Sequence, residues 1–508
     1  MNHLPILPIL IPLLAGALIL LVERRGMAAQ RMVAWSSMAT LLVTAIVLAA
    51  RADEGTPMVY LVGDWPARLG IALMVDRVNA LMVLATVLLG IASLLYACAG
   101  WDRRALHFHA LFQLQLAGLN GAFLTGDLFN LFVFFEVLLI ASYGLLLSGG
   151  RGLRMRAGLH YVVFNIMAST LFLIALGLLY GLTGTLNMAE MALRIAAAPA
   201  SDLALIRAAS GILLVVFCAK AALLPLYLWL PETYARAPAA VVALFTVMTK
   251  LGVYAVLRVY SLVFGPGAGE ISGWAWDWLL PAGAVTLVLA SLGALAGRTL
   301  RGTVGYLVIG SAATLFIAFS LQTPAAVGAG LYYLLHSTFV TAALFLILDL
   351  VRRQRGATAD SLETAAPMGS KTLLGILFLI AAVSVAGLPP LSGFIGKLTL
   401  LAAVPVEQTS WIWATILITS LMVVVALSRV GSQVFWRAGT YAECEAPTPP
   451  QRVEIAAAML LTAYGIALVL GAAPVLRYTQ AAGEQILEPS QHLESVRAAQ
   501  PQLRAPSP

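Results

Sequence analysis

Residues 220–258 read KAALLPLYLWLPETYARAPAAVVALFTVMTKLGVYAVLR, a stretch that places two lysines inside apolar segments. Lys220 belongs to the apolar run ILLVVFCAKAALLPLYLWLP, which Pro225 interrupts, and Lys250 lies midway along the next run. Proline breaks the helical hydrogen-bond ladder, and a membrane tolerates such a break only where protein or a wet cavity satisfies the freed groups. The stretch therefore predicts a broken membrane helix followed by an intact one, each with a buried lysine.

The rest of the chain has the composition of a membrane protein. Of its 508 residues, 61% are hydrophobic and only 10% are charged, too few to cover a soluble protein of this size. Apolar runs long enough to cross a bilayer recur from end to end, and the first lacks the features of a cleaved signal peptide. We predict an all-α polytopic protein with about fourteen spans, near residues 4–22, 32–50, 73–97, 105–125, 127–148, 157–181, 207–230, 238–263, 278–297, 302–321, 325–350, 372–402, 410–434 and 453–475.

Basic residues predict the orientation of these spans. The net charge is +7, and most basic residues fall in the odd-numbered loops, for example at Arg24 and Arg25, at Arg103 and Arg104, and from Arg352 to Lys371. Even-numbered loops hold few. Since cytoplasmic loops carry the excess of Lys and Arg, the odd loops are predicted to be cytoplasmic and both termini to lie outside, in the periplasm of an inner-membrane protein.

A second expected span is also interrupted. The twelfth, LFLIAAVSVAGLPPLSGFIGKLTLLAAV, contains Pro389 and Pro390 and then Lys397. The broken helices are five spans apart, so a five-helix repeat would place its second copy upside down, a pattern that points to a transport site. We expect one domain over residues 1–476, with repeats near 105–263 and 278–434, and a short polar tail over 477–508. Ordinary kinking by proline is the alternative.

Four charged residues lie too deep in their predicted spans to reach the interface: Glu136, Lys220, Lys250 and Lys397. Each central charge costs roughly 2.5–3.5 kcal/mol on insertion scales, so it must pair, lose its charge or face water. A proton path offers all three. The alternative is static ion pairs between helices, which stabilise poorly because desolvation offsets the Coulomb gain.

His336 lies mid-span in LYYLLHSTFVTAALF, and a histidine suits proton relay at physiological pH. The alternative is a histidine satisfied by a nearby hydroxyl, such as that of Ser337 or Thr341. No motif indicates a cofactor, a metal or a chemical active site: Walker A, dinucleotide and HExxH patterns are missing. The three cysteines, Cys98, Cys218 and Cys444, are far apart in sequence without metal-ligand spacing. No basic stretch is interleaved with aromatics as nucleic-acid binding requires.

Residues 220–258 resemble the core of the antiporter-like membrane subunits. That group includes subunits L, M and N of respiratory complex I, membrane hydrogenase subunits, and the Mrp (Pha or Mnh) multisubunit Na+(K+)/proton antiporters. The segments MNHLPILPILIPLLAGALILLVERR, GDWPARLGIALMVDRVNALMVLAT and NLFVFFEVLLIASYGLLL are most similar to the D-type subunits of the Mrp group. The chain also stops soon after its last span and carries lysine rather than glutamate at position 397, unlike the patterns of the complex I subunits L and M.

The resemblance implies a role for each buried charge. Glu136 is expected to tune Lys220, the central proton carrier, while Lys250 and His336 continue the relay to a terminal Lys397. It also implies a secondary transporter that is driven by the proton-motive force. Its expected partners are subunits of the A, B, C, E, F and G types and the lipid bilayer. Two alternatives remain: a proton-pumping subunit of complex I or a hydrogenase, and a scaffold that only packs against its partners.

Overall fold

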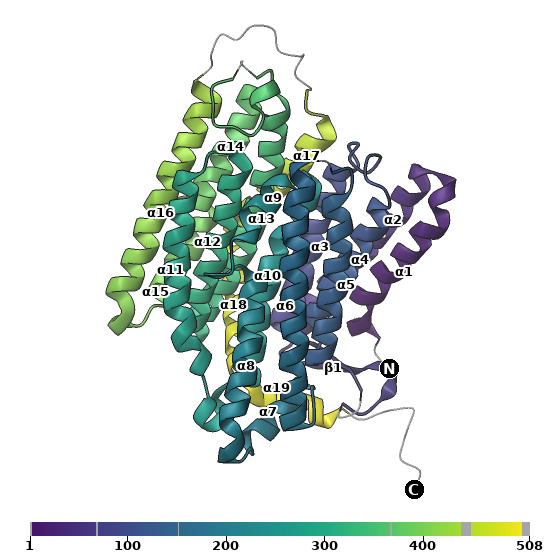
Figure 1. The fold of residues 1–508 in the computed structure, drawn as a ribbon, viewed down its shortest axis with the longest axis vertical. Coiled ribbons are helices and arrows are strands. Elements are labelled where there is room, and N and C mark those ends of the chain that lie inside the picture. The colour runs from purple at the N-terminus through teal and green to yellow at the C-terminus, as the bar shows by residue number, and fades with distance from the viewer. Residues whose placement is uncertain (1–2, 68–69, 151, 366–367, 438–448, 500–508) are drawn as a thin grey trace.

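The computed structural model describes residues 3–67, 70–150, 152–365, 368–437 and 449–499, so Arg68, Arg151 and Cys444 lie outside the described residues. It is a bundle of helices that run along one long axis (Figure 1). Within these ranges, 12 helices are long and apolar enough to cross a membrane. They are built on α1 (Leu7–Val22), α2 (Met27–Asp53), α3 (Arg77–Ala97), α5 (Leu128–Leu147), α6 (Leu153–Thr183), α8 (Ala200–Ala221), α10 (Ala239–Leu262), α11 (Trp274–Ala296), α12 (Leu300–Ser320), α13 (Pro324–Arg353), α16 (Thr409–Gly431) and α17 (Arg452–Leu470).

The other expected spans have counterparts of a different form. The span predicted over 105–125 is α4 (Phe108–Leu124), a helix of 17 residues. The twelfth is split into α14 (Lys371–Ala386) and α15 (Ser392–Ala402), and the seventh into α8 and the short α9 (Trp229–Arg236). The breaks expected at the proline-containing segments are therefore present in the structure, and the predicted all-α membrane fold is confirmed.

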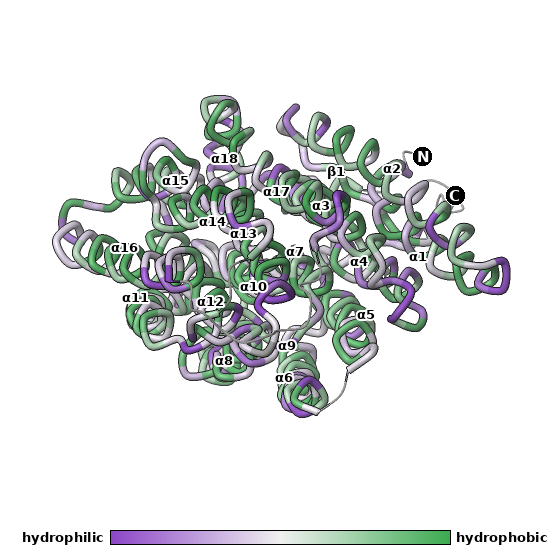
Figure 2. Tube along the Cα trace, turned by 90° about the horizontal axis from the view of Figure 1, so that it is seen from above, coloured by the Kyte–Doolittle hydropathy of each residue, from purple (hydrophilic) through white to green (hydrophobic). Residues whose placement is uncertain are grey.

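Two central helices make the core of the bundle. The apolar windows of α10 and α13 are completely buried, whereas those of α1, α2 and α6 are 39% buried. Viewed from above, α10 and α13 lie in the middle while α1 and α16 lie at opposite edges (Figure 2). A helix that is apolar on all sides packs well only inside a bundle, so these two can carry polar side chains away from lipid.

The end of the bundle near the N-terminus carries short elements that the sequence did not predict. The antiparallel strands β1 (Met58–Leu61) and β2 (Ala72–Val75) pair there, next to α7 (Met188–Ala196) (Figure 1). The first residues of the span expected over 73–97 therefore form a strand. Helix α3 begins only at Arg77, because the side chain of Asp76 accepts a hydrogen bond from Asn79 N and caps it.

Residues 477–498, within the segment expected as a polar tail, are largely helical. α18 (Ala472–Leu487) follows α17 and packs along the first half of α13, where Gly483 and Gly328 allow close approach. α19 (Pro489–Ala498) then contacts α7, β1 and α18. Thr479 and Ala482 are fully buried, so burial of a few small residues stabilises a segment whose average composition is polar. The N-terminus and α19 lie at the same end of the bundle (Figure 1).

Candidate functional site

Lys220 lies at the break of the seventh span. It is the penultimate residue of α8, and Ala222 beyond it has a left-handed backbone with φ 59°. Gly252 of α10 packs against this point, since a Cβ there would lie 2.6 Å from Ala221 N. The glycine thus lets the central helix approach the buried backbone at the end of α8. Lys220 itself is 6% exposed.

A serine joins Lys220 to Glu136. The Lys220 ammonium donates to Asn165 Oδ1 and Ser169 Oγ of α6, each at 3.4 Å. Ser169 in turn donates a short hydrogen bond to Glu136 Oε1 of α5. The Phe135 ring lies under the ammonium, 5.6 Å from its centroid, which adds a cation–π contact. Because a hydroxyl both donates and accepts, this arrangement is a continuous polar bridge between a carboxylate and an amine.

Lys250 is fully buried on α10 and has a single hydrogen-bond partner among the described residues. Its ammonium donates to Ser311 Oγ of α12 at 2.5 Å, and Ser311 donates to Val308 O at 2.7 Å. Within the described ranges, no hydrogen bond links the Lys220 group to Lys250. The two lysines are held on neighbouring helices, α8 and α10, which pack along each other.

His336 of α13 faces the break of the twelfth span. Its Nδ1 lies 2.9 Å from Ser392 Oγ, the first residue of α15. Gly393 follows, and a Cβ at this position would lie 2.9 Å from His336 Nε2. The hydroxyls that the sequence offered as partners are engaged elsewhere: Ser337 donates to Leu334 O and Thr341 to Ser337 O. The partner of His336 is therefore supplied across the break rather than from its own helix.

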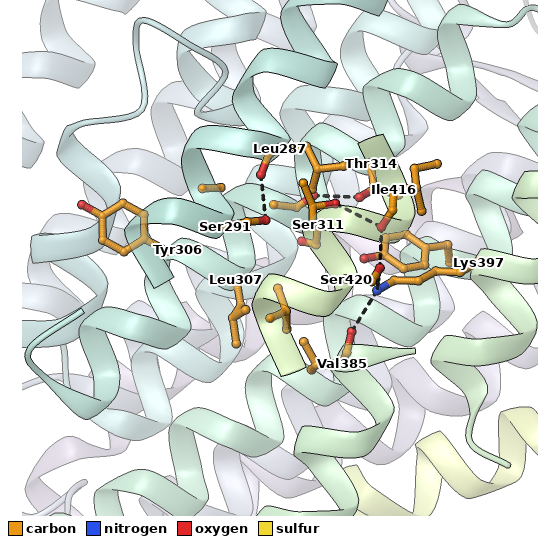
Figure 3. Close-up of a pocket in the computed structure, with 15 residues that line it drawn as sticks. Leu287, Ser291, Tyr306, Leu307, Ser311, Thr314, Val385, Lys397, Ile416 and Ser420 are labelled. Carbon is orange, nitrogen blue, oxygen red and sulfur yellow. Dashed lines mark hydrogen bonds between the residues drawn. The ribbon is translucent and has the colours of Figure 1, made fainter. Parts of the chain in front are cut away.

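Lys397 of α15 donates to three oxygens: Ser420 Oγ of α16 at 2.8 Å, Ala386 O at 2.9 Å and Val385 O at 3.3 Å. The two carbonyls end α14, so the negative end of a half-helix faces the ammonium. Figure 3 shows Lys397 and Ser420 on one side of a small cavity of about 30 Å³ and Ser311 across it. The cavity has room for a water molecule between Lys397 and Ser311, which is the hydrogen-bond partner of Lys250.

The predicted site residues thus form two groups. Glu136 and Lys220 share one polar bridge. Lys397 and Ser311, the partner of Lys250, line one cavity, and His336 lies at the second break. Sequence reasoning did not name the hydroxyl and amide partners. The spacing of Asn165 and Ser169, four residues apart on one helix face, was the available signal. The others are single serines with no pattern: Ser311, Ser392 and Ser420.

Polar residues near the helix ends differ in burial. His160 is exposed, whereas Asp349 is 7% exposed and binds Arg352 at 2.7 Å. Cys98 lies with Asp102 and His109 within 4.8 Å, although their sequence spacing did not suggest a cluster. Asp102 already accepts two hydrogen bonds from Arg31 and lies 3.1 Å from His109. The charge of Arg31 opposes a metal ion at this position.

These features define a polytopic membrane protein of the antiporter-like type, with ionisable side chains buried at two helix breaks. A family model described as "NADH:quinone oxidoreductase/Mrp antiporter, TM" matches residues 125–423, and the chain belongs to that family. A Rhizobium meliloti strain 1021 protein, named as the D subunit of a probable K(+)/H(+) antiporter, is 40% identical, with 98% of each chain covered. The Bacillus subtilis strain 168 protein named as the D subunit of a Na(+)/H(+) antiporter is 35% identical over 98% of this chain and 99% of its own.

A solved structure has the same fold. A chain in the structure of the Mrp complex from Dietzia sp. DQ12-45-1b superposes with a TM-score of 0.86 at 26% sequence identity. The match covers 98% of this chain and 100% of that one. The resemblance inferred from the quoted motifs is therefore confirmed over nearly the whole length of the chain.

Proposed function

We propose that this chain is the D-type, proton-translocating subunit of a multisubunit antiporter that exchanges protons for Na+ or K+ and is driven by the proton-motive force. It acts with partner subunits of the A, B, C, E, F and G types in a bacterial inner membrane. The names of the two relatives support the transporter class, and the structural likeness to a chain of an Mrp complex supports assembly with partners. In this proposal the chain has no chemical active site of its own.

One observation carries the proposed proton path. Lys220, Lys250 and Lys397 each donate to neutral oxygens, and within the described ranges none of them forms an ion pair with a carboxylate. Static ion pairs therefore do not explain their presence. A buried amine that rests on hydroxyls can lose its proton without leaving a carboxylate unpaired. Waters beside the breaks can complete the relay.

The proposed proton-relay roles follow the positions of the ionisable groups from the first helix break to the second. We assign Glu136 and Ser169 to tune and feed Lys220, Lys250 and His336 to carry the proton across the middle, and Lys397 to exchange it at the second break. A proton crossing 100 mV gains about 2.3 kcal/mol, enough to bias such transfers. The breaks fall in the fourth span of each five-helix set, which supports the proposed inverted repeats over about 105–263 and 278–434.

The test is antiport in membrane vesicles that contain all subunits of the complex. Lys220→Ala and Glu136→Ala are expected to reduce cation-dependent proton exchange at least tenfold while the chain still inserts. Each removes one end of the Ser169 bridge. Lys371→Ala is the matched control, because Lys371 is exposed at the start of α14 and is expected to leave exchange unchanged. Normal antiport in both site variants would refute the assignment.

A further inference from the structure

A second polar cavity, of about 170 Å³, lies where α10 begins and α13 ends. It is at the end of the bundle away from the N-terminus, the predicted cytoplasmic side, and it is separate from the breaks described above. Its walls come from the ends of several helices and from the α3–α4 loop. Two carboxylates line it, Asp349 and Glu454, against five arginines: Arg104, Arg154, Arg301, Arg352 and Arg353.

Neighbouring carboxylates neutralise three of these arginines. Arg301 pairs with Asp360 at 2.5 Å, and Asp360 does not line the cavity. The two carboxylates that line the cavity pair with the other two arginines. Asp349 binds Arg352 and Glu454 binds Arg353, each at 2.7 Å.

Arg104 and Arg154 form no ion pair within the described part of the chain. The cavity therefore holds an excess of positive charge.

Arg154 is half-buried, and not all of its guanidinium N–H donors are used. Its Nε donates to Arg236 O at 2.9 Å and its Nη1 to Ser148 O at 3.3 Å, both neutral carbonyls. The guanidinium lies over Trp101, 5.3 Å from the ring centroid. Trp101 Nε1 is itself buried without a hydrogen-bond partner among the described residues. An indole N–H can only donate, so the missing partner is an acceptor.

The start of α10 adds further donors. Ala239 and Ala240, its first two residues, line the cavity, and the capping residue Pro238 has no side chain that could accept their N–H groups. The positive end of this 24-residue helix thus faces the same space as Arg154 and Trp101. Unpaired donors of three kinds thus belong to residues that line one cavity.

We propose that this cavity binds a phosphate group, carried either by the headgroup of an anionic phospholipid or by free inorganic phosphate. Phosphate oxygens are acceptors only, and they match a guanidinium fork and helix N–H groups at the same time. Basic pockets between membrane helices on the cytoplasmic side recognise anionic headgroups by the same chemistry. The site does not depend on the transport proposal, because none of the buried lysines lines it.

The test uses the purified, lipid-depleted complex and two probes. Inorganic phosphate is titrated while thermal unfolding is followed, and phosphatidylglycerol is titrated while bound lipid is counted by native mass spectrometry. At least one probe is expected to bind saturably to the wild type. Arg154→Gln is expected to weaken that binding roughly tenfold, which corresponds to about 1.4 kcal/mol.

Two further variants separate binding from folding. Trp101→Phe keeps the ring under Arg154 and removes only the N–H, so it is expected to weaken binding in the same direction. Arg156→Gln is the matched control, because Arg156 is exposed on the same helix and does not line the cavity. Saturable binding of phosphatidylglycerol alone assigns the site to lipid, and binding of phosphate alone assigns it to the free anion. Binding of neither probe, or equal binding by all four proteins, would overturn the proposal.

Discussion

Ser169 is the residue on which the contact between Glu136 and Lys220 depends. It accepts from the ammonium and donates to the carboxylate, so it holds the two groups in one hydrogen-bonded chain without direct ionic contact. A proton can follow such a chain only if the middle group both accepts and donates. Asn165 accepts from the same ammonium but makes no bond to Glu136 among the described contacts. Ser169 is therefore the connecting residue.

Ser169→Ala is expected to slow antiport severalfold to tenfold while leaving the fold intact, because it removes the connection and keeps both charged groups. Proton exchange in vesicles is the measurement. Thr170→Val is the matched control: Thr170 is exposed at the adjacent position, and among the described residues its hydroxyl bonds only to Ile166 O of its own helix. Wild-type exchange rates in the serine variant would show that the bridge is not used.

At the scale of the elements, the break between α14 and α15 is a close-packed joint. Gly387, with φ 81°, ends α14, and Gly393 sits against the His336 ring at the start of α15. A larger residue at 393 has no free space, since both the ring and the carbonyl of Ser384 are in contact distance. The joint thereby fixes the distance between His336 and the oxygens that hold Lys397.

Gly393→Ala is expected to destabilise the protein by about 1–3 kcal/mol, the usual cost of overpacking, and to reduce antiport by moving α15. Thermal unfolding in detergent and vesicle transport measure the two effects. Gly177→Ala on α6 is the control: a Cβ there meets nothing within 4 Å, so alanine is expected to be neutral or slightly stabilising. Equal stability of both variants would show that the joint can yield.

Helix α19 lies outside the spans and buries His492 near Asp76 and near Arg258 of α10. His492 is 7% exposed, and burial, together with the charge of Arg258, lowers its pKa to about 3, although Asp76 acts in the opposite direction. The folded state thus binds this proton less well than the unfolded chain, whose histidine titrates near 6.5. The stability of this contact is complete above about pH 6.5 and declines as the pH falls towards 3.

Acidification from pH 7.5 to 5.5 is therefore expected to loosen α19 by about 1.4 kcal/mol, roughly tenfold in the open population. Cleavage near residues 489–498 by an added protease, normalised to its activity at each pH, measures the opening. In His492→Gln the side chain stays neutral, so the normalised cleavage rate is expected to be the same at both pH values. A tenfold faster cleavage at pH 5.5 in that variant, as in the wild type, would assign the acid sensitivity to other groups.

For the whole molecule, the charge distribution and the fold together predict how the bundle is oriented in the membrane. The structure places the N-terminus and α19 at the same end of the bundle (Figure 1), and the distribution of arginines predicts that this end faces outward. Alkaline phosphatase fused to the C-terminus is expected to be active and a fluorescent protein at the same position dark. Fusions after Gly356, in the loop between α13 and α14, are expected to show the opposite. A fluorescent C-terminal fusion contradicts this topology.

The sequence alone predicted the membrane class, most of the spans, the two broken helices and the burial of Lys220, Lys250 and His336. It could do so because apolar length, proline and the cost of a buried charge are local properties. It did not predict the strands near residues 58–75 or the helical C-terminal segment, whose stability comes from packing against α13 and α7. Which neutral oxygens contact each lysine depends on how the helices pack. Ser169, Ser311 and Ser420 come from helices distant in the chain, and a serine in an apolar run gives no sign of what it will face.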